Sequence, residues 1–255
     1  MEMKNVSQVI SVTGMILSAT PVGEYDKRIV MLTKEHGKIA AFAKGARRPQ
    51  SHLAGVTAPC CFGQFQLFEG RSSYTIQSAE ISQYFPEFRT DFEAACYGFY
   101  FLEFAAWYTR EENDETEMLK LLYQTLRALA KRTIPLRLVR RIFELKAVTI
   151  NGEGPQVLNC VSCGAEGGSG LFSVSRGGLV CPNCAGKAPD AIPLHPSVLY
   201  ALQFIAVTPV EKLYTFTLKE EVLAELDQVT ERYLERYVGR HFHSLEILEE
   251  MEAHT

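Results

Sequence analysis

Residues 160–184 read CVSCGAEGGSGLFSVSRGGLVCPNC, and the two C-x₂-C clips at the ends of this segment are its most informative feature. Seventeen residues lie between Cys163, which ends the first clip, and Cys181, which begins the second. This spacing is typical of a tetrahedral zinc site, because each clip lets two thiolates reach one metal ion from a tight turn. The sequence therefore predicts one Zn²⁺ held by the four cysteines.

The residues around the clips favour a zinc ribbon. Residues 171–174 and 179–180 are expected to form two short strands around a glycine turn. Gly164 and Gly186 follow the clips and are expected to supply positive φ angles. A pair of disulfides is the alternative, but it belongs to small secreted domains, and residues 1–6 lack the apolar segment of a secretion signal. Four thiolates leave no open coordination position, which favours a structural over a catalytic metal.

The bulk properties indicate a globular protein of the cytoplasm. A chain of 255 residues with 47% hydrophobic content can bury a core of one large or two modest domains. The longest apolar run, residues 97–108, is shorter than the ~20 residues of a membrane span and contains Glu103. Outside the clips, Cys60, Cys61 and Cys96 form an odd set that suits a reducing compartment, and we expect them to be buried.

Charge is distributed unevenly along the chain. The net charge is −4, yet residues 1–80 carry nine Lys and Arg against six Asp and Glu, whereas residues 81–255 carry 17 against 24. Binding of a polyanion depends on the local field and not on the average. The basic N-terminal part therefore remains a candidate for nucleic-acid binding.

The N-terminal part is predicted to be a small β-barrel. Short segments rich in β-branched and aromatic residues are separated by turn residues; they are residues 9–13, 15–18, 28–33, 38–43, 61–68 and 74–80. About five strands within ~75 residues favour an OB-fold. We expect this domain to span residues 1–81.

Helical periodicity follows from residue 84 onward. Helices are expected from Asp91-Phe92, from Thr116, from Pro135 to Ile150, from His195 to Ala206 and from Glu220 to Gly239, with a frayed polar tail over 249–255. The sequence thus predicts an α+β protein in which an OB-fold barrel precedes a helical domain. That domain should comprise residues 82–155 and 188–250, with the zinc ribbon inserted at 156–187.

One group of basic residues lies within the predicted barrel. Its members are Lys27, Arg28, Lys34, Lys38, Lys44, Arg47 and Arg48, and the aromatic residues Phe42, Phe62, Phe65, Phe68 and Tyr74 are interleaved at strand spacing in the same predicted barrel. Cations that track a backbone, together with aromatic faces that stack bases, are typical of single-strand binding sites. The alternative is that the aromatic rings form the barrel core and the lysines a solvated face.

A second basic group lies in the helical part. It consists of Arg127, Lys131, Arg132, Arg137, Arg140, Arg141 and Lys146, with Glu144 as the one acid among them. Part of it could be an ordinary solvated helix face with i,i+4 pairs. The other interpretation is a surface for an acidic peptide or for a second DNA segment.

Enzyme signatures are missing from the sequence. It contains no phosphate-binding loop, dinucleotide fingerprint, His-Glu-x-x-His motif or Gly-x-Ser-x-Gly elbow. We therefore expect a protein that is not an enzyme.

Several fragments, taken in order, resemble the RecO family of bacterial DNA repair proteins. They are Thr13-Gly-Met-Ile-Leu17, Gly23-Glu24, Asp26-Lys-Arg-Ile-Val30, residues 37–47, Ser78-Ala-Glu80, Phe143-Glu-Leu145, Gly154-Pro155, Cys160-x₂-Cys163-Gly164 and residues 239–245. The resemblance covers nearly the whole chain. It implies a recombination mediator that binds single- and double-stranded DNA and anneals complementary strands. It further implies action with RecR to load RecA onto strands coated by single-strand binding protein, at the bacterial nucleoid.

The resemblance also implies sites. DNA contacts of the family fall on the basic OB-fold face, which here maps to the seven barrel cations from Lys27 to Arg48. Docking of the acidic C-terminal tail of single-strand binding protein falls on the helical domain, where Arg127, Lys131, Arg132, Arg137, Arg140 and Arg141 offer a basic surface. The alternatives are a zinc-ribbon nucleic-acid-binding or nuclease subunit, and a protein-interaction scaffold without annealing activity.

Overall fold

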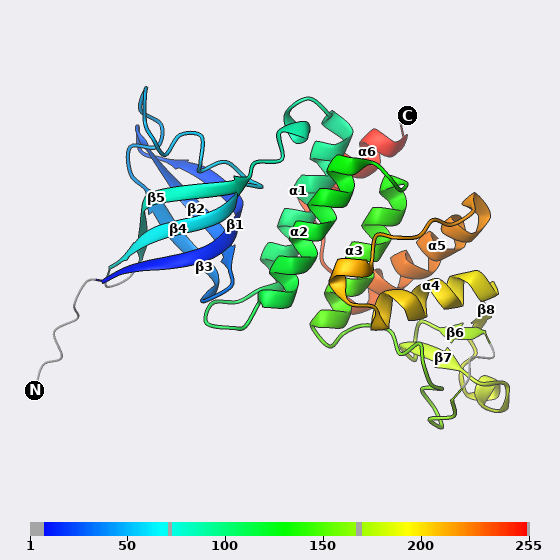
Figure 1. Cartoon of the computed structure of the whole chain (residues 1–255). Coiled ribbons are helices and arrows are strands. Elements are labelled where there is room, and N and C mark those ends of the chain that lie inside the picture. Colours follow the sequence, from blue (N-terminus) through cyan, green and yellow to red (C-terminus); the bar gives the residue numbers. More distant parts are fainter. Residues whose placement is uncertain (1–7, 71–72, 167–169, 254–255) are drawn as a thin grey trace, which may run out of the picture. The chain divides into compact units, whose positions relative to one another are not determined.

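The structure is a computed structural model that describes residues 8–70, 73–166 and 170–253 (Figure 1). It confirms the predicted α+β class, with an N-terminal barrel followed by helices and a cluster of four cysteines. The contacts divide the chain into two compact units, of which the first joins Met1–Ala130 to His243–Thr255 and the second is Lys131–Phe242. No helix in the described part of the chain is long and apolar enough to span a membrane.

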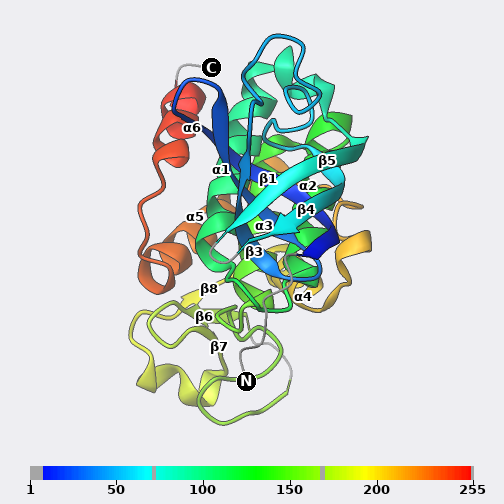
Figure 2. The same ribbon diagram turned by 90° about the vertical axis from the view of Figure 1, so that its left-hand side faces the viewer.

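Five strands close the barrel of the first unit, as expected for an OB-like fold (Figure 2). They are β1 (Gln8–Val22), β2 (Asp26–Thr33), β3 (Gly37–Ala43), β4 (Phe62–Glu69) and β5 (Tyr74–Gln83), arranged in the order β1-β2-β3-β5-β4. The two segments expected at 9–13 and 15–18 form the single strand β1, whose register with β2 shifts between Ile16 and Ser18. The parallel β3–β5 pairing that completes the barrel is short, joining Ala41 to Tyr74 and Phe42 to Thr75.

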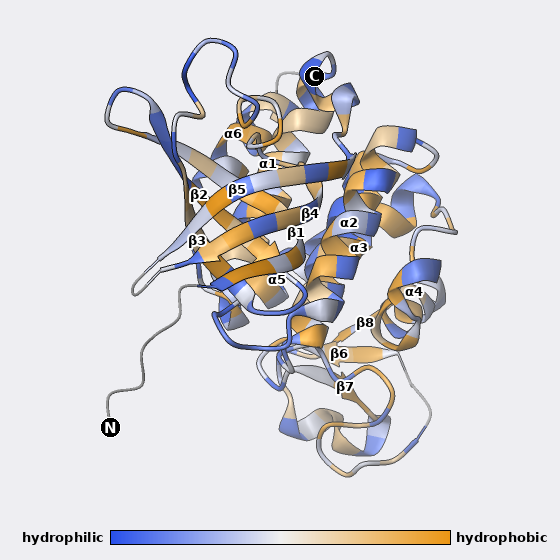
Figure 3. Cartoon of the chain, turned by 60° about the vertical axis from the view of Figure 1, so that its left-hand side comes forward, coloured by the Kyte–Doolittle hydropathy of each residue, from blue (hydrophilic) through white to orange (hydrophobic). Residues whose placement is uncertain are grey.

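Strand alternation decides which side chains face the barrel interior. In β3, Ile39 and Ala41 are buried in the barrel core, whereas Lys38, Ala40 and Phe42 between and beside them are only half-buried. Successive side chains of a strand point to opposite faces, so these three residues lie on the outer face. Figure 3 shows hydrophobic residues concentrated on the strands and hydrophilic residues on the loops that connect them.

Helices complete the first unit. They are the short 3₁₀ helix η1 (Pro86–Arg89), α1 (Phe92–Tyr108), α2 (Thr116–Lys131) and α6 (His243–Ala253). Helix α1 begins where the sequence predicts, because the Asp91 carboxylate accepts a hydrogen bond from the Ala94 backbone N–H at 3.0 Å. The buried aromatic residues of α1, among them Tyr100, Phe101 and Phe104, form much of its packing surface.

The C-terminal segment differs from the frayed tail that the sequence predicts. Residues up to Ala253 belong to α6, which packs against α1 (Figure 2). The Glu103 carboxylate of α1 accepts hydrogen bonds from the backbone N–H groups of His243 and Ser244 at 3.3 and 2.9 Å, and Tyr97 bonds Glu252 near the other end. These tertiary contacts hold a polar helix in place, and a sequence pattern does not record them. Residues 254–255 lie outside the described residues.

The loop between α1 and α2 packs against the turn between β2 and β3. The backbone N–H of Lys38 donates to the Arg110 carbonyl at 2.8 Å, and that of Glu112 donates to the His36 carbonyl at 3.0 Å. Gly37 lies at φ +64°, and a Cβ atom there would be 2.3 Å from the Arg110 oxygen. Only glycine fits such an approach, so the loop is fixed to the barrel through its backbone.

The second unit consists of three long helices and a small sheet. Its elements are α3 (Leu136–Ile150), β6 (Leu171–Ser173), β7 (Gly178–Val180), the 3₁₀ helix η2 (Pro182–Lys187), β8 (Ile192–Pro193), α4 (Pro196–Val207), the 3₁₀ helix η3 (Val210–Lys212) and α5 (Glu220–Tyr237). The sheet has the order β7-β6-β8. The starts and ends of α3, α4 and α5 agree with the predicted helices to within two residues.

Helices α3 and α5 are joined by a network of ion pairs. Glu144, fully buried, accepts from Arg140 Nε and from Arg141 Nη1, both at 2.9 Å. Arg141 Nε also donates to Asp227 Oδ1 of α5 at 2.6 Å, and its remaining nitrogen bonds Glu231. Burial alone would lower the pKa of Arg141, but the carboxylates of Glu144 and Asp227 outweigh it and raise this pKa. The Arg141 guanidinium therefore stays charged at neutral pH.

We predict that Glu144→Gln lowers the free energy of unfolding by about 3–5 kcal/mol, because it leaves two buried guanidinium groups without their shared carboxylate. Glu231→Gln is the matched control. It removes a partner of the same Arg141 whose side chain is 55% exposed, and should cost less than about 1 kcal/mol. Urea denaturation of the two variants measures both values. Equal losses would contradict the assigned role of the buried carboxylate.

Candidate metal centre and nucleic-acid interface

The structure brings together the four cysteines of the clips. The Sγ atoms of Cys160, Cys163, Cys181 and Cys184 all lie within 4.8 Å of one another. Cys160 and Cys184 are buried, whereas Cys163 is exposed. Such a cluster can bind a metal ion, and four sulfur donors at this separation fit a zinc site.

Backbone hydrogen bonds arrange the first clip around its sulfur. The N–H groups of Cys181 and Ser162 donate to Cys160 Sγ at 3.3 and 3.4 Å. These bonds lower the pKa of the Cys160 thiol to about 6, which favours the thiolate that a metal requires. Gly164 adopts the positive φ of 73° expected for this turn. The same expectation for Gly186 is wrong, because Gly186 lies inside the 3₁₀ helix η2, whose φ angles are negative.

The pKa of the fourth cysteine depends on the other three sulfurs. Hydrogen bonds with Cys181 and Cys163, together with the proximity of the other sulfurs, raise the pKa of Cys184 to about 12. Four thiolates this close repel one another. A divalent ion removes that repulsion, so metal binding and complete deprotonation of the cluster depend on each other.

A small sheet supports the cluster. Strands β6 and β7 pair from Leu171↔Val180 to Ser173↔Gly178, as the ribbon pattern predicts. The turn between them is held by Asp190, whose carboxylate accepts from the Ser175 backbone N–H at 2.8 Å and from the Ser173 hydroxyl at 2.7 Å. Burial acts to raise the pKa of Asp190, but these hydrogen bonds lower it to about 2. The Asp190 carboxylate is therefore ionised near neutral pH, and its hydrogen bonds to the β6–β7 hairpin are retained there.

The predicted DNA-contacting residues separate into two groups on the barrel. Lys27, Lys44, Arg47 and Arg48 lie where β2 begins and β3 ends. Arg47 Nη1 donates to the carbonyls of Gly23 and Glu24, both at 3.2 Å, and the Arg48 guanidinium carbon lies 5.0 Å from the ring centre of Tyr25. Both arginines are exposed. Their side chains are thus positioned at the surface, where phosphate groups can reach them.

Two of the predicted cations lie at the opposite ends of these strands. Lys34 is exposed in the β2–β3 turn. The Lys38 ammonium group donates to the Ala106 carbonyl of α1 at 2.5 Å, and burial followed by the charge of Arg110 lowers its pKa. Lys38 therefore contributes to the packing of α1 on the barrel, which sequence spacing alone did not indicate.

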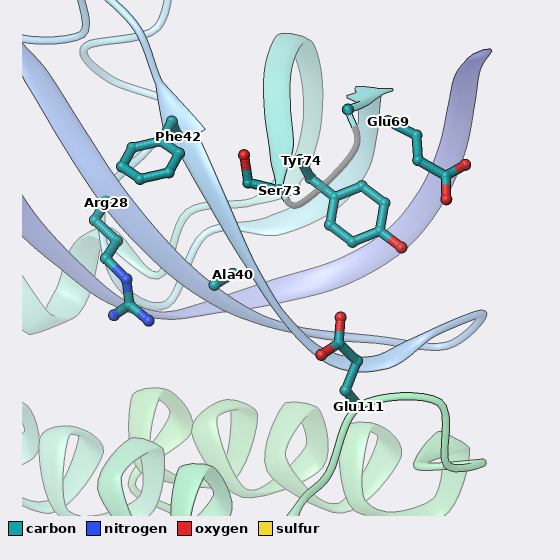
Figure 4. A pocket seen from close by; sticks show the side chains of 8 residues that line it. Arg28, Ala40, Phe42, Glu69, Ser73, Tyr74 and Glu111 are labelled. Atoms are coloured by element: carbon teal, nitrogen blue, oxygen red, sulfur yellow. The ribbon is translucent and has the colours of Figure 1, made fainter. Parts of the chain in front are cut away.

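A hollow of about 460 Å³ lies on the outer face of the barrel. It is lined by Arg28, Ala40, Phe42, Glu69, Gly70, Ser73, Tyr74 and Glu111 (Figure 4). Arg28 and Phe42 are neighbours because they are register partners of β2 and β3. Of the aromatic residues proposed from the sequence, Phe42 and Tyr74 face this hollow, whereas Phe65 is fully buried in the barrel core.

The hollow includes acidic residues that the sequence did not place there. Glu111 lies in the loop between α1 and α2, and Glu69 is the last residue of β4. Only the docking of the α1–α2 loop on the barrel brings Glu111 beside Tyr74. No sequence motif signals this contact.

The second basic group does not form the expected surface. Arg140 and Arg141 are 4% and 3% exposed and are bound to carboxylates, which corrects the expectation that they receive an acidic peptide. Arg137 bonds Glu220 at 2.6 Å and also bonds Asp227.

Three members of this group precede α3 in the chain. Arg127 lies 5.8 Å from the Tyr123 ring centre in the first unit. Lys131 and Arg132 remain exposed, and Arg132 lines a hollow of about 350 Å³ with residues 133–136.

Comparisons with known proteins give a consistent result along the chain. Residues 6–85 match the N-terminal domain of recombination protein O, and residues 89–246 match its C-terminal domain. The chain is 33% identical over 241 residues to the DNA repair protein RecO of Alkaliphilus metalliredigens, an alignment that covers 94% of this chain and 98% of the relative. It is 31% identical over 240 residues to that of Bacillus subtilis, covering 94% of each. Identity to the RecO of Acetivibrio thermocellus is 29% over 245 residues, covering 95% and 97%.

Proposed function

The chain belongs to the recombination protein O family of DNA repair proteins, and on that premise we propose that it acts without catalysis as a recombination mediator. In this proposal it binds single- and double-stranded DNA and anneals complementary strands. With RecR it then helps to load RecA onto strands that are coated by single-strand binding protein. We place this activity in the bacterial cytoplasm, at the nucleoid.

The observation that carries the proposal is the surface of cations and rings on the barrel. Arg47 and Arg48 are exposed on a turn whose backbone is tied to the neighbouring hairpin, since the Arg47 N–H donates to the Tyr25 carbonyl at 2.9 Å. Lys44 is exposed beside them, and Phe42 lies on the outer face of the strand that precedes this turn. Guanidinium groups bind phosphates and aromatic faces stack bases, so this surface suits an unpaired strand.

Replacing Arg47 and Arg48 together by alanine should weaken binding to all single-stranded sequences alike. Each phosphate contact contributes ~0.7 to the slope of log K against log salt, so the double variant should lower that slope by about 1.4. The same variant should anneal complementary oligonucleotides more slowly. Fluorescence anisotropy across a salt series measures the slope, and energy transfer between labelled strands measures annealing.

Lys212→Ala with Lys219→Ala is the charge-matched control for this experiment. Both lysines are exposed, and both belong to the second unit, whereas the barrel belongs to the first. An unchanged slope in the arginine variant, or an equal fall in the control, would place the DNA contacts elsewhere.

We infer that the ion in the cysteine cluster is a single structural Zn²⁺. The donor set supports this assignment, because sulfur ligands in a tetrahedral set favour zinc and leave no position for a reacting water. In this role the ion would tie the two clips together, and with them the hairpin of β6 and β7. The free energy of metal binding then becomes part of the folding free energy of the second unit.

Purified protein should accordingly contain one equivalent of zinc by atomic emission. Cys160→Ser should lose the metal and lower the melting temperature, because it removes the sulfur that also accepts the Cys181 and Ser162 hydrogen bonds. Single-stranded DNA binding by the barrel should be retained. Cys96→Ser, at a buried cysteine outside the cluster, is the control and should keep the metal. Retention of full zinc by the Cys160 variant would contradict the assignment.

We propose that the acidic tail of single-strand binding protein docks near Lys131 and Arg132. What supports this position is the hollow lined by residues 132–136, where Ile134 and Leu136, both largely buried, form part of the wall beside the Arg132 cation. An acidic peptide that ends in an apolar side chain would place its carboxylates on the cations and its last residue against the apolar wall.

Lys131→Glu with Arg132→Glu should reduce the affinity for such a tail peptide by at least about ten-fold, since two attractions become repulsions. Affinity for naked single-stranded DNA should stay within about two-fold. Isothermal titration calorimetry with both ligands distinguishes the outcomes. Unaltered peptide affinity would refute the site, and an equal loss of DNA binding would make it a DNA contact instead.

A further inference from the structure

The hollow on the barrel has two chemically different sides (Figure 4). Arg28 and Phe42 lie on one side, Glu69 and Glu111 lie on the other, and Tyr74 stands between them. A site that bound only the phosphate backbone would be lined by cations. The two carboxylates on one wall indicate a ligand that presents hydrogen-bond donors there.

The position of Glu111 is set by the backbone. Glu111 forms an isolated β-bridge with Gly37 of the barrel, and the next residue, Glu112, donates its N–H to the His36 carbonyl. The loop is further fixed because the Arg110 N–H donates to the Glu115 carboxylate at 2.9 Å. Glu112 itself pairs with His36 Nδ1 at 3.8 Å and does not line the hollow. Of these two adjacent acids, only Glu111 belongs to the site.

The carboxylates make one wall of the hollow negative. Burial raises the pKa of the Tyr74 hydroxyl, and the charges of Glu69, Glu112 and Glu111 raise it further. Among the described residues, neither Glu69 nor Glu111 has a hydrogen bond or ion pair through its carboxylate. A phosphate would be repelled from this wall, whereas an amino group would be attracted to it.

A nucleotide satisfies both sides of the hollow at once. Its base can stack on the Phe42 and Tyr74 rings while its phosphate approaches Arg28. The edge of the base then meets the carboxylates. Cytosine presents an N4 amino group that donates to a carboxylate, whereas thymine presents at the same place an O4 carbonyl that a carboxylate repels.

We propose that this hollow is a nucleobase pocket in which the Glu111 carboxylate, with Glu69, selects bases that carry an exocyclic amino group. The inference deepens the proposed function and rests on it, since it names the bases that the single-strand site prefers. It predicts that binding to single strands is not uniform: cytosine-rich strands bind more tightly than thymine-rich strands of the same length.

The test compares oligo(dC) with oligo(dT), two pyrimidine strands that differ at the hydrogen-bonding edge. The affinity for each labelled strand is measured by fluorescence anisotropy at pH 8, where cytosine is neutral. EDTA is present so that no divalent ion bridges Glu69 and Glu111. The full-length protein should bind oligo(dC) at least about three-fold more tightly than oligo(dT), because a hydrogen bond to a charged acceptor discriminates by this much or more. Glu111→Gln should abolish the preference mainly by tightening oligo(dT), because an amide can donate to O4 and carries no charge.

Glu112→Gln is the matched control, since it removes the same charge from the adjacent residue but leaves the pocket wall intact. It should retain the preference for oligo(dC). Equal affinity of the unaltered protein for the two strands would overturn the inference while leaving the proposed function standing. Loss of the preference in both variants would overturn the assignment of Glu111. Failure to bind either strand would instead overturn the proposed function itself.

Discussion

The approach of the Arg110 carbonyl to Gly37 is the contact on which the acidic wall of the barrel hollow depends. It requires a residue without Cβ at positive φ, and it fixes the α1–α2 loop against the turn between β2 and β3. The same contact places Glu111 in the hollow, and nearby the Lys38 ammonium group donates to the Ala106 carbonyl of α1. The segment from α1 into the α1–α2 loop thus binds one barrel cation and adds one anion to the barrel face. The resulting face is mixed in charge, in contrast to the uniform basic groove that the sequence indicates.

Cations that look alike in the sequence have three different roles in the structure. Arg47 and Arg48 are exposed at a turn. Lys38, half-buried, and Lys146, buried, use their ammonium groups inside the fold to donate to backbone carbonyls, the latter to those of Ala206 and Thr208 at 3.0 and 2.8 Å at the end of α4. Arg141 is buried among carboxylates and joins α3 to α5. Only the first role leaves the charge available to a partner, so a count of basic residues overestimates a binding surface.

The sequence predicts those features that depend on local spacing. The cysteine clips, the strands of the barrel, the start of α1 at Asp91-Phe92 and the start and end of α3 follow from patterns within about 25 residues, and the structure confirms them. The sequence does not predict pairings between residues that lie far apart along the chain. The Arg141–Asp227 pair and the Glu111–Gly37 bridge connect positions about 70 residues or more apart. A helix period gives the face on which Arg141 lies, but not that α5 brings a carboxylate to it. For the same reason the sequence predicts a frayed tail from residue 249 onward, where α6 in fact continues to Ala253.

The return of α6 to the first unit has a consequence for synthesis of the protein. The first unit combines residues up to Ala130 with a helix that begins at His243, so the whole second unit is translated between its two parts. At about 5–20 residues per second, the ribosome needs on the order of ten seconds to make that interval. During this time α1 is present without the helix that Glu103 caps and that Tyr97 bonds. Completion of the first unit is thus delayed until α6 has been translated, and a nascent chain that stops before α6 leaves that side of α1 uncovered.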